Sequence, residues 1–128
     1  MFPRSGDVRF YRVLTAYIPG VGPCTTQVEL VEDQLILRPD TTTWFEIPLD
    51  HANACRLLDA LTGEVPGIVR TQHPRNGATT VAVALHGPSA ASLRVENVAK
   101  GMLHVVFDET QLPELTMHLE DGATWLPH

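Results

Sequence analysis

The sequence has few cysteines, few basic residues and no long apolar run. Lys and Arg together number 9 against 15 Asp and Glu, which gives a formal net charge of −6, and no segment concentrates positive charge. Such a chain repels phosphate groups, so we expect neither nucleic acid nor an anionic membrane as a partner. No apolar stretch approaches the roughly 20 residues of a membrane-spanning helix, and residues 1–7 lack the apolar core of a signal peptide.

Cys24 and Cys55 are the only cysteines, and their spacing matches no zinc or redox motif. Two free thiols suit a reducing compartment. We therefore predict a soluble, cytoplasmic protein without a metal or cofactor. A length of 128 residues fits one domain spanning residues 1–128, long enough to bury a core without a disulfide or metal.

Motifs that carry chemistry are scarce as well. No serine lies in a Gly-x-Ser-x-Gly setting, and no His-Glu-x-x-His spacing occurs. Residues 19–26 superficially resemble a phosphate-binding loop, but Pro23 removes one N–H donor and a strand, not a helix, follows. We interpret this segment as a turn between strands, and nothing nearby in the sequence activates Cys24 as a nucleophile.

What the chain does contain is alternation of apolar and polar residues with a period of two, which is typical of β-strands with one buried face. Pro48 cannot donate a ladder hydrogen bond, so its strand should end there or lie at a sheet edge. Asn76-Gly77 is a strong hairpin signal. The predicted strands are residues 7–18, 25–32, 34–38, 44–49, 68–72, 78–86, 93–98 and 102–108.

One segment has a clear helical pattern. Asp50 is a suitable N-cap, and an apolar stripe follows at Ala54, Leu57, Leu58 and Leu61. Since Gly63 is placed where helices commonly stop, we predict a helix near residues 51–62.

The segment around residues 114–120 fits two structures. Pro113 and Glu114 could open a helix with Leu112, Leu115 and Leu119 on one stripe. A period of two also runs through the segment, and Asp121-Gly122 is a hairpin signal, so we favour a β-hairpin.

These patterns predict an α+β, β-rich fold: a mainly antiparallel sheet, curved or in two layers, packed on the main helix near 51–62. Roughly eight to ten strands are expected, and no sequence repeat is evident. The expected core consists of Phe45, Ile47, Leu49, Leu57, Leu58, Leu61, Val81, Val83, Leu85, Leu103, Val105 and Phe107.

Three histidines are the candidate ligand-binding residues. His86, His104 and His118 each neighbour an expected core residue, so each points away from the core if its segment is a strand. On adjacent strands they would converge, and could serve as acid–base or metal groups. Without a short ligand spacing, we predict no metal site and interpret them as surface or interface histidines.

The non-core face of the second group of strands is unusually apolar. Ala82, Ala84, Met102 and Val106 lie on it together with His104. Such a face is covered by a second layer of the same chain, by a second copy of the protein or by a ligand. We hypothesise a non-catalytic binding or protein-interaction module that forms a homodimer. The alternative is a small enzyme or ligand carrier with a histidine-lined pocket for a small molecule in the curved sheet.

Overall fold

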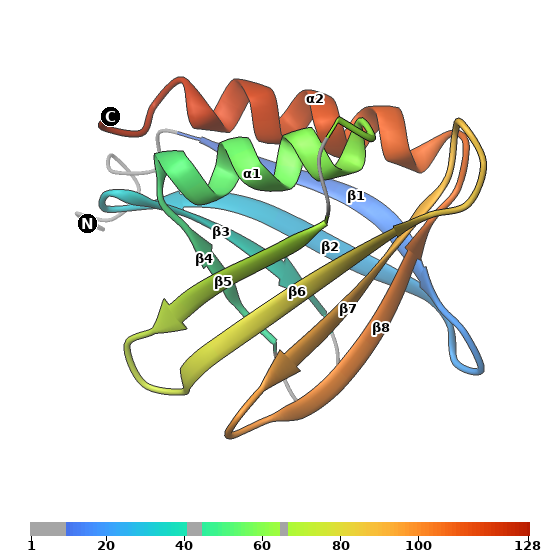
Figure 1. Cartoon of the computed structure of the whole chain (residues 1–128), viewed down its shortest axis with the longest axis horizontal. Helices are drawn as coiled ribbons and strands as arrows, with labels where there is room; N and C mark the ends of the chain where they lie inside the picture. The colour runs from blue at the N-terminus through green and yellow to red at the C-terminus, as the bar shows by residue number, and fades with distance from the viewer. Residues whose placement is uncertain (1–9, 41–44, 65–66) are drawn as a thin grey trace, which may run out of the picture.

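The computed structural model describes residues 10–40, 45–64 and 67–128. It contains one eight-stranded sheet and two helices (Figure 1). The predicted start of the first strand at Asp7 and the predicted strand residue Trp44 lie outside the described residues. The elements are β1 (Tyr11–Ile18), β2 (Gly22–Val31), β3 (Gln34–Pro39), β4 (Ile47–Leu49), α1 (His51–Leu61), β5 (Ile68–His73), β6 (Gly77–Leu85), β7 (Ala91–Asn97), β8 (Gly101–Phe107) and α2 (Gln111–Ala123).

The sheet is antiparallel throughout, with strand order β4-β3-β2-β1-β8-β7-β6-β5. The predicted α+β, β-rich architecture with a curved antiparallel sheet is confirmed. Four strands followed by a helix occur twice in succession, although the sequence shows no repeat. Each half is a meander of neighbouring strands, and the two halves meet where β1 pairs with β8 at Tyr17 and Val106.

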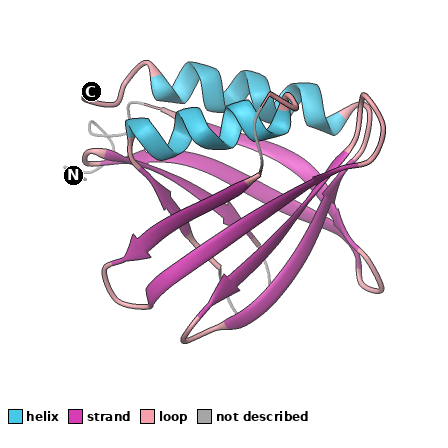
Figure 2. Cartoon of the chain, viewed as in Figure 1, coloured by secondary structure: helices cyan, strands magenta, loops and turns pink. Residues whose placement is uncertain are grey.

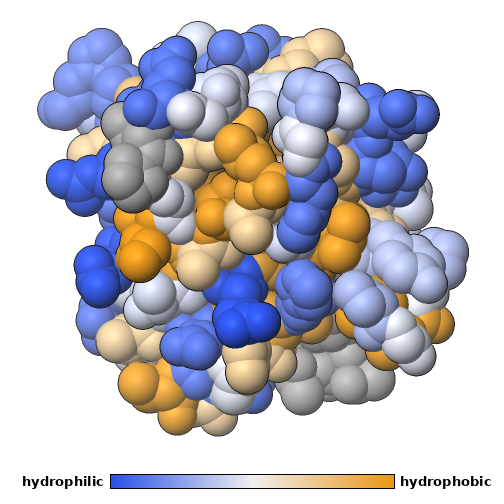
Figure 3. All heavy atoms as spheres, turned by 45° about the vertical axis from the view of Figure 1, so that its right-hand side comes forward, coloured by the Kyte–Doolittle hydropathy of each residue, from blue (hydrophilic) through white to orange (hydrophobic). Residues whose placement is uncertain are grey.

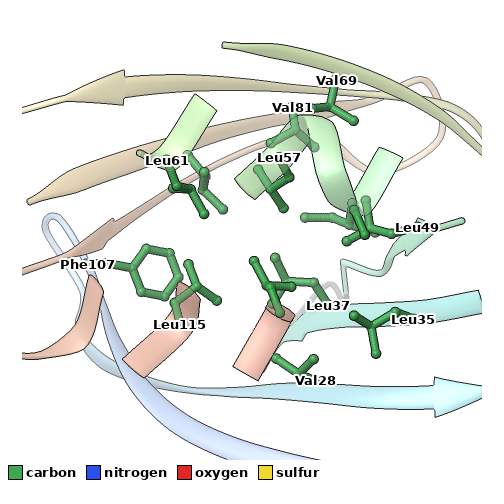
Figure 4. Packing of buried hydrophobic residues seen from close by; sticks show 14 of the residues in the cluster. Val28, Leu35, Leu37, Leu49, Leu57, Leu61, Val69, Val81, Phe107 and Leu115 are labelled. Atoms are coloured by element: carbon green, nitrogen blue, oxygen red, sulfur yellow. The ribbon is translucent and has the colours of Figure 1, made fainter. Parts of the chain in front are cut away.

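Both helices lie on the concave side of the sheet, next to each other (Figure 2). Apolar side chains from α1, α2 and the inner face of the sheet fill the space between these layers. Figure 4 shows Leu57 and Leu61 of α1 facing Phe107 and Leu115 across this core. Within the described residues, neither helix is long and apolar enough to cross a membrane.

The helix predicted near 51–62 is confirmed as α1, and its start has the predicted cause. The Asp50 side chain accepts a hydrogen bond from the Asn53 backbone N–H at 2.8 Å. Ala54, Leu57 and Leu61 of α1 are buried in the core. Gly63 follows the helix with φ +82°, a conformation that glycine adopts without strain.

The hairpin favoured for residues 114–120 is wrong, because this segment forms α2. Pro113 lies in the first turn, where its missing N–H costs nothing. Leu112, Leu115 and Leu119 all face the core. Gly122 is not a turn glycine but a point of close approach: a Cβ there would lie 2.7 Å from Cδ1 of Leu35.

Most of the predicted core residues are buried, and Leu58, Val83 and Leu103 pack against the core partly buried. Leu85 was predicted in the core wrongly, since 43% of it is exposed at the far end of β6. The observed strands begin and end within a few residues of their predicted bounds. The segment predicted as a strand over 44–49 is a strand only over Ile47–Leu49.

The two outermost strands, β4 and β5, come together so that the sheet nearly closes on itself. Pro48 sits on β4, the edge strand, as its missing N–H predicted. Its carbonyl accepts a hydrogen bond from the Thr71 hydroxyl of β5 at 2.5 Å. We call this junction the seam; side chains, rather than a backbone ladder among the described residues, hold it together.

Candidate functional site

The structure does not bring the three candidate histidines together. His104 is exposed on the outer face of β8. His86 follows β6, and its Nε2 lies 2.9 Å from the Ser92 hydroxyl. The backbone N–H of His86 bonds to Ala90, just before β7, whereas His104 pairs with Arg94 further along that strand. The His86 ring reaches Ser92, which is two residues from Arg94 along β7, or about 7 Å, and no hydrogen bond joins the rings of His86 and His104.

His118 is on the opposite side of the sheet from His104. It is buried on α2, not outward-facing as the strand interpretation of its segment required. Its Nε2 lies 3.5 Å from a carboxylate oxygen of Glu114, one helical turn away. Its Nδ1 is buried and has no hydrogen-bond partner among the described residues. The three grooves described in this fold are lined by other residues.

The residues of the apolar face predicted from the sequence lie on the side of the sheet away from the helices. Val106 and Ala82 are half-buried, while Ala84 and Met102 are exposed. Strand pairing aligns Ala84, Ser92, Val106 and Tyr17 in one row across four strands, with Ala82, Arg94 and His104 in the next. β1 extends the face with further exposed apolar side chains. We define the outer face as Tyr11, Val13, Tyr17, Ala82, Ala84, Arg94, Glu96, Met102, His104 and Val106.

One face of the protein carries several apolar side chains near its middle. Figure 3 turns the right-hand side of Figure 1 toward the viewer and shows orange side chains in the middle of the visible surface, with blue ones around them. Met102 is 59% exposed and Tyr17 is 47% exposed, and leaving this much apolar area in water is unfavourable in free energy. Grouped apolar surface with a polar surround is typical of a protein contact site.

A second group of interacting side chains lies at the seam, and no sequence pattern predicts it. Glu46, just before β4, accepts hydrogen bonds from Arg38 Nε and from His73 Nε2, each at 2.8 Å. Arg38 also donates to Gln27 at 2.9 Å and to Glu29 at 3.1 Å on β2. Glu46 and His73 are 27 residues apart in sequence, so only the meeting of β4 and β5 unites them.

The charges at the seam reinforce one another. Burial opposes the ionisation of Glu46, but hydrogen bonds from His73 and Arg38, with the nearby positive charge, hold the pKa of Glu46 below its usual value. Burial works against the charge of Arg38 too, yet Glu29 and Glu46 raise the pKa of its guanidinium. The seam therefore carries a fixed ion pair at neutral pH.

A groove of about 370 Å³ lies over this ion pair. Ile36, Pro48 and Pro74 supply apolar walls, while Arg38 and Glu46 supply charge. The hydrogen bonds of both charged groups are already directed at each other and at neighbouring side chains. This arrangement stabilises the seam and does not display an activated acid, base or nucleophile.

Both cysteines are free thiols. Residues 19–21 form the predicted turn between β1 and β2, and Cys24 is buried just beyond it. Burial raises the pKa of the Cys24 thiol, although contacts with Thr26 and Asp40 oppose this, so the thiol stays protonated at neutral pH. Cys55 lies 3.8 Å from Nδ1 of His51 on α1.

No group of three or more His, Cys, Asp or Glu side chains in the described part of the chain could hold a metal ion. In comparisons with known proteins, no family model, no curated protein and no solved structure matches this chain.

Proposed function

We propose that this protein is a non-catalytic interaction module that forms a homodimer through the outer face. The observation that carries the proposal is the exposure of Tyr17 on β1 and Met102 on β8, neighbouring strands of one sheet surface, with exposed Val13 and Tyr11 further along β1. The inner face already packs on both helices, so the outer face has no covering layer among the described residues. Covering these side chains removes apolar area from water, which favours association by about 25 cal/mol per Å².

The charges on the outer face favour a second copy of the chain as the occupant. Arg94 and Glu96 lie two residues apart on β7 and point to the same side. In a twofold contact the same surface meets itself in the reverse direction, so each Arg94 can face the partner's Glu96. The two charges cancel within the outer face, so the net charge of −6 on the whole chain does not concentrate repulsion there.

The cytoplasmic setting predicted from the sequence is part of this proposal. Both cysteines are free in the structure, one buried and one half-buried. Free thiols persist in a reducing compartment, where a self-associating module would keep Cys24 and Cys55 unpaired.

The proposal is tested with two matched methionine variants. Met102 is on the outer face, 59% exposed, and Met117 is on the solvent side of α2, 48% exposed. Met102→Glu places a charge in the contact, where leaving it unpaired weakens association at least about tenfold. Met117→Glu should leave association unchanged. Sedimentation equilibrium or light scattering over a range of concentrations measures both.

A second variant probes the centre of the same surface. Val106 pairs with Tyr17 where the two halves of the sheet meet, so Val106→Asp should also weaken association. A wild-type protein that remains monomeric at several hundred micromolar contradicts the proposal. Equal weakening by Met102→Glu and Met117→Glu would contradict the choice of surface.

A further inference from the structure

His73 joins the two sides of the seam with both of its ring nitrogens. Nε2 lies 2.8 Å from Oε1 of Glu46, and Nδ1 lies 3.0 Å from the backbone nitrogens of both Arg75 and Asn76. The two backbone groups can only donate, so Nδ1 must be the acceptor and the imidazole proton must be on Nε2. The ring is therefore neutral, and it holds the β5–β6 turn closed while its other nitrogen donates to Glu46.

The same turn geometry occurs between β7 and β8 with a side chain that does not titrate. Oδ1 of Asn97 accepts hydrogen bonds from the backbone N–H groups of Ala99 and Lys100, both at 2.9 Å. In each hairpin the capping residue pairs with a glycine four positions later, Gly77 or Gly101, which has positive φ. The chain thus has two equivalent turns, one capped by an amide and one by an imidazole.

The charged groups around His73 determine what protonation does. Glu46 faces Nε2, Arg38 of β3 binds the other oxygen of Glu46, and Arg75 of the turn lies 3.6 Å from Glu46 with 79% of its side chain exposed. A second proton on the ring would strengthen the bond to Glu46 by adding charge. That proton would sit on Nδ1, directed at two N–H donors, so both turn hydrogen bonds would be lost.

We propose that His73 is an acid-sensitive cap of the β5–β6 turn, at the wall of the seam groove that Pro74 and Arg75 line. The neutral ring holds the backbone N–H groups of Arg75 and Asn76. The imidazolium keeps its bond to Glu46 but gives up both N–H groups, so the turn loses its cap while the pairing of His73 with Gly77 keeps the hairpin in place. Histidine is the side chain suited to such a change between about pH 5 and 8.

Nuclear magnetic resonance of the whole chain tests this cap directly. At pH 7.5 the imidazole nitrogen shifts should report a neutral ring protonated on Nε2. As the pH falls, the amide shifts of Arg75 and Asn76 should move with the same midpoint as the ring. Their exchange protection, corrected for intrinsic rates, should fall about tenfold, while the Ala99 and Lys100 amides in the equivalent turn stay protected.

His73→Asn is the matched variant, because asparagine already caps the equivalent turn at Asn97. It keeps an acceptor for the two backbone N–H groups but cannot be protonated, so residues 75 and 76 should stay protected at both pH values. The proposal is overturned if the wild-type ring carries its proton on Nδ1 or stays neutral down to acid unfolding. It is also overturned if Arg75 and Asn76 keep their protection after the ring is protonated, or if His73→Asn loses it in acid.

Discussion

Leu115 and Met117 distinguish the helix α2 from the hairpin that the sequence also allows. In α2, Leu115 is fully buried, whereas Met117 is 48% exposed. A strand would place both side chains on one face, because its period is two. Truncating each residue to alanine therefore has different consequences in the two structures.

The expected cost of Leu115→Ala follows from its burial. Three carbon atoms are lost from a fully packed position, which corresponds to about 2.4 kcal/mol of transfer free energy at 0.8 kcal/mol per methylene. The cavity left between the helices and the sheet brings the total to about 3–4 kcal/mol. Domains of this size unfold with about 5–15 kcal/mol, so the variant remains folded but is clearly destabilised.

Urea unfolding followed by circular dichroism measures this difference. With a slope near 2 kcal/mol per molar urea, Leu115→Ala should lower the midpoint by about 1.5–2 M. Met117→Ala removes a partly exposed side chain and replaces it with a better helix former, so its effect should stay below about 1 kcal/mol. Similar losses for the two variants would refute the helical packing of residues 111–123.

Three further predictions concern capping and charge. Asp50→Ala removes the acceptor for the Asn53 N–H, so the free energy of unfolding measured with urea should fall by about 1 kcal/mol. The helical circular dichroism signal near the midpoint should fall only if α1 frays. Asn97→Ala leaves two turn N–H groups without their acceptor and removes the donor to the buried Thr79 hydroxyl, so we expect a loss of about 1–3 kcal/mol; an unchanged midpoint would exclude the capping role. Glu46→Gln should cost about 1.5–2 kcal/mol at pH 7, because it weakens charged hydrogen bonds at a partly exposed site. Since the pKa of Glu46 is lowered on folding, that stability is present above pH about 4.3 and is lost as the pH falls through the folded-state pKa, so the gap between wild type and variant should narrow in acid.

Local sequence patterns were sufficient to predict secondary structure in segments whose pattern fits only one backbone geometry. The alternation of Phe45, Ile47 and Leu49 predicts a strand, which forms over Ile47–Leu49. Pro48 predicts that this strand ends there or lies at an edge, and β4 is an edge strand. The cap at Asp50 and the stripe through Leu57 define α1 in the same way. In these segments the spacing of apolar residues and the presence or absence of a backbone N–H decide the secondary structure. Both act over only a few residues, so they can be recognised in the sequence.

Tertiary structure decided the rest. Residues 112–122 fit both a helix and a hairpin, and the close packing of Gly122 on Leu35 belongs to the helix alone. The contact of Glu46 with His73 depends on β4 meeting β5, which no local pattern specifies. The sequence by itself determined the eight strands approximately and where the first helix begins, because those preferences arise from neighbouring residues, but it did not determine the second helix. Strand order, sheet closure and the separation of His104 from His118 arose only from long-range packing, because the pairing of distant strands depends on the whole core.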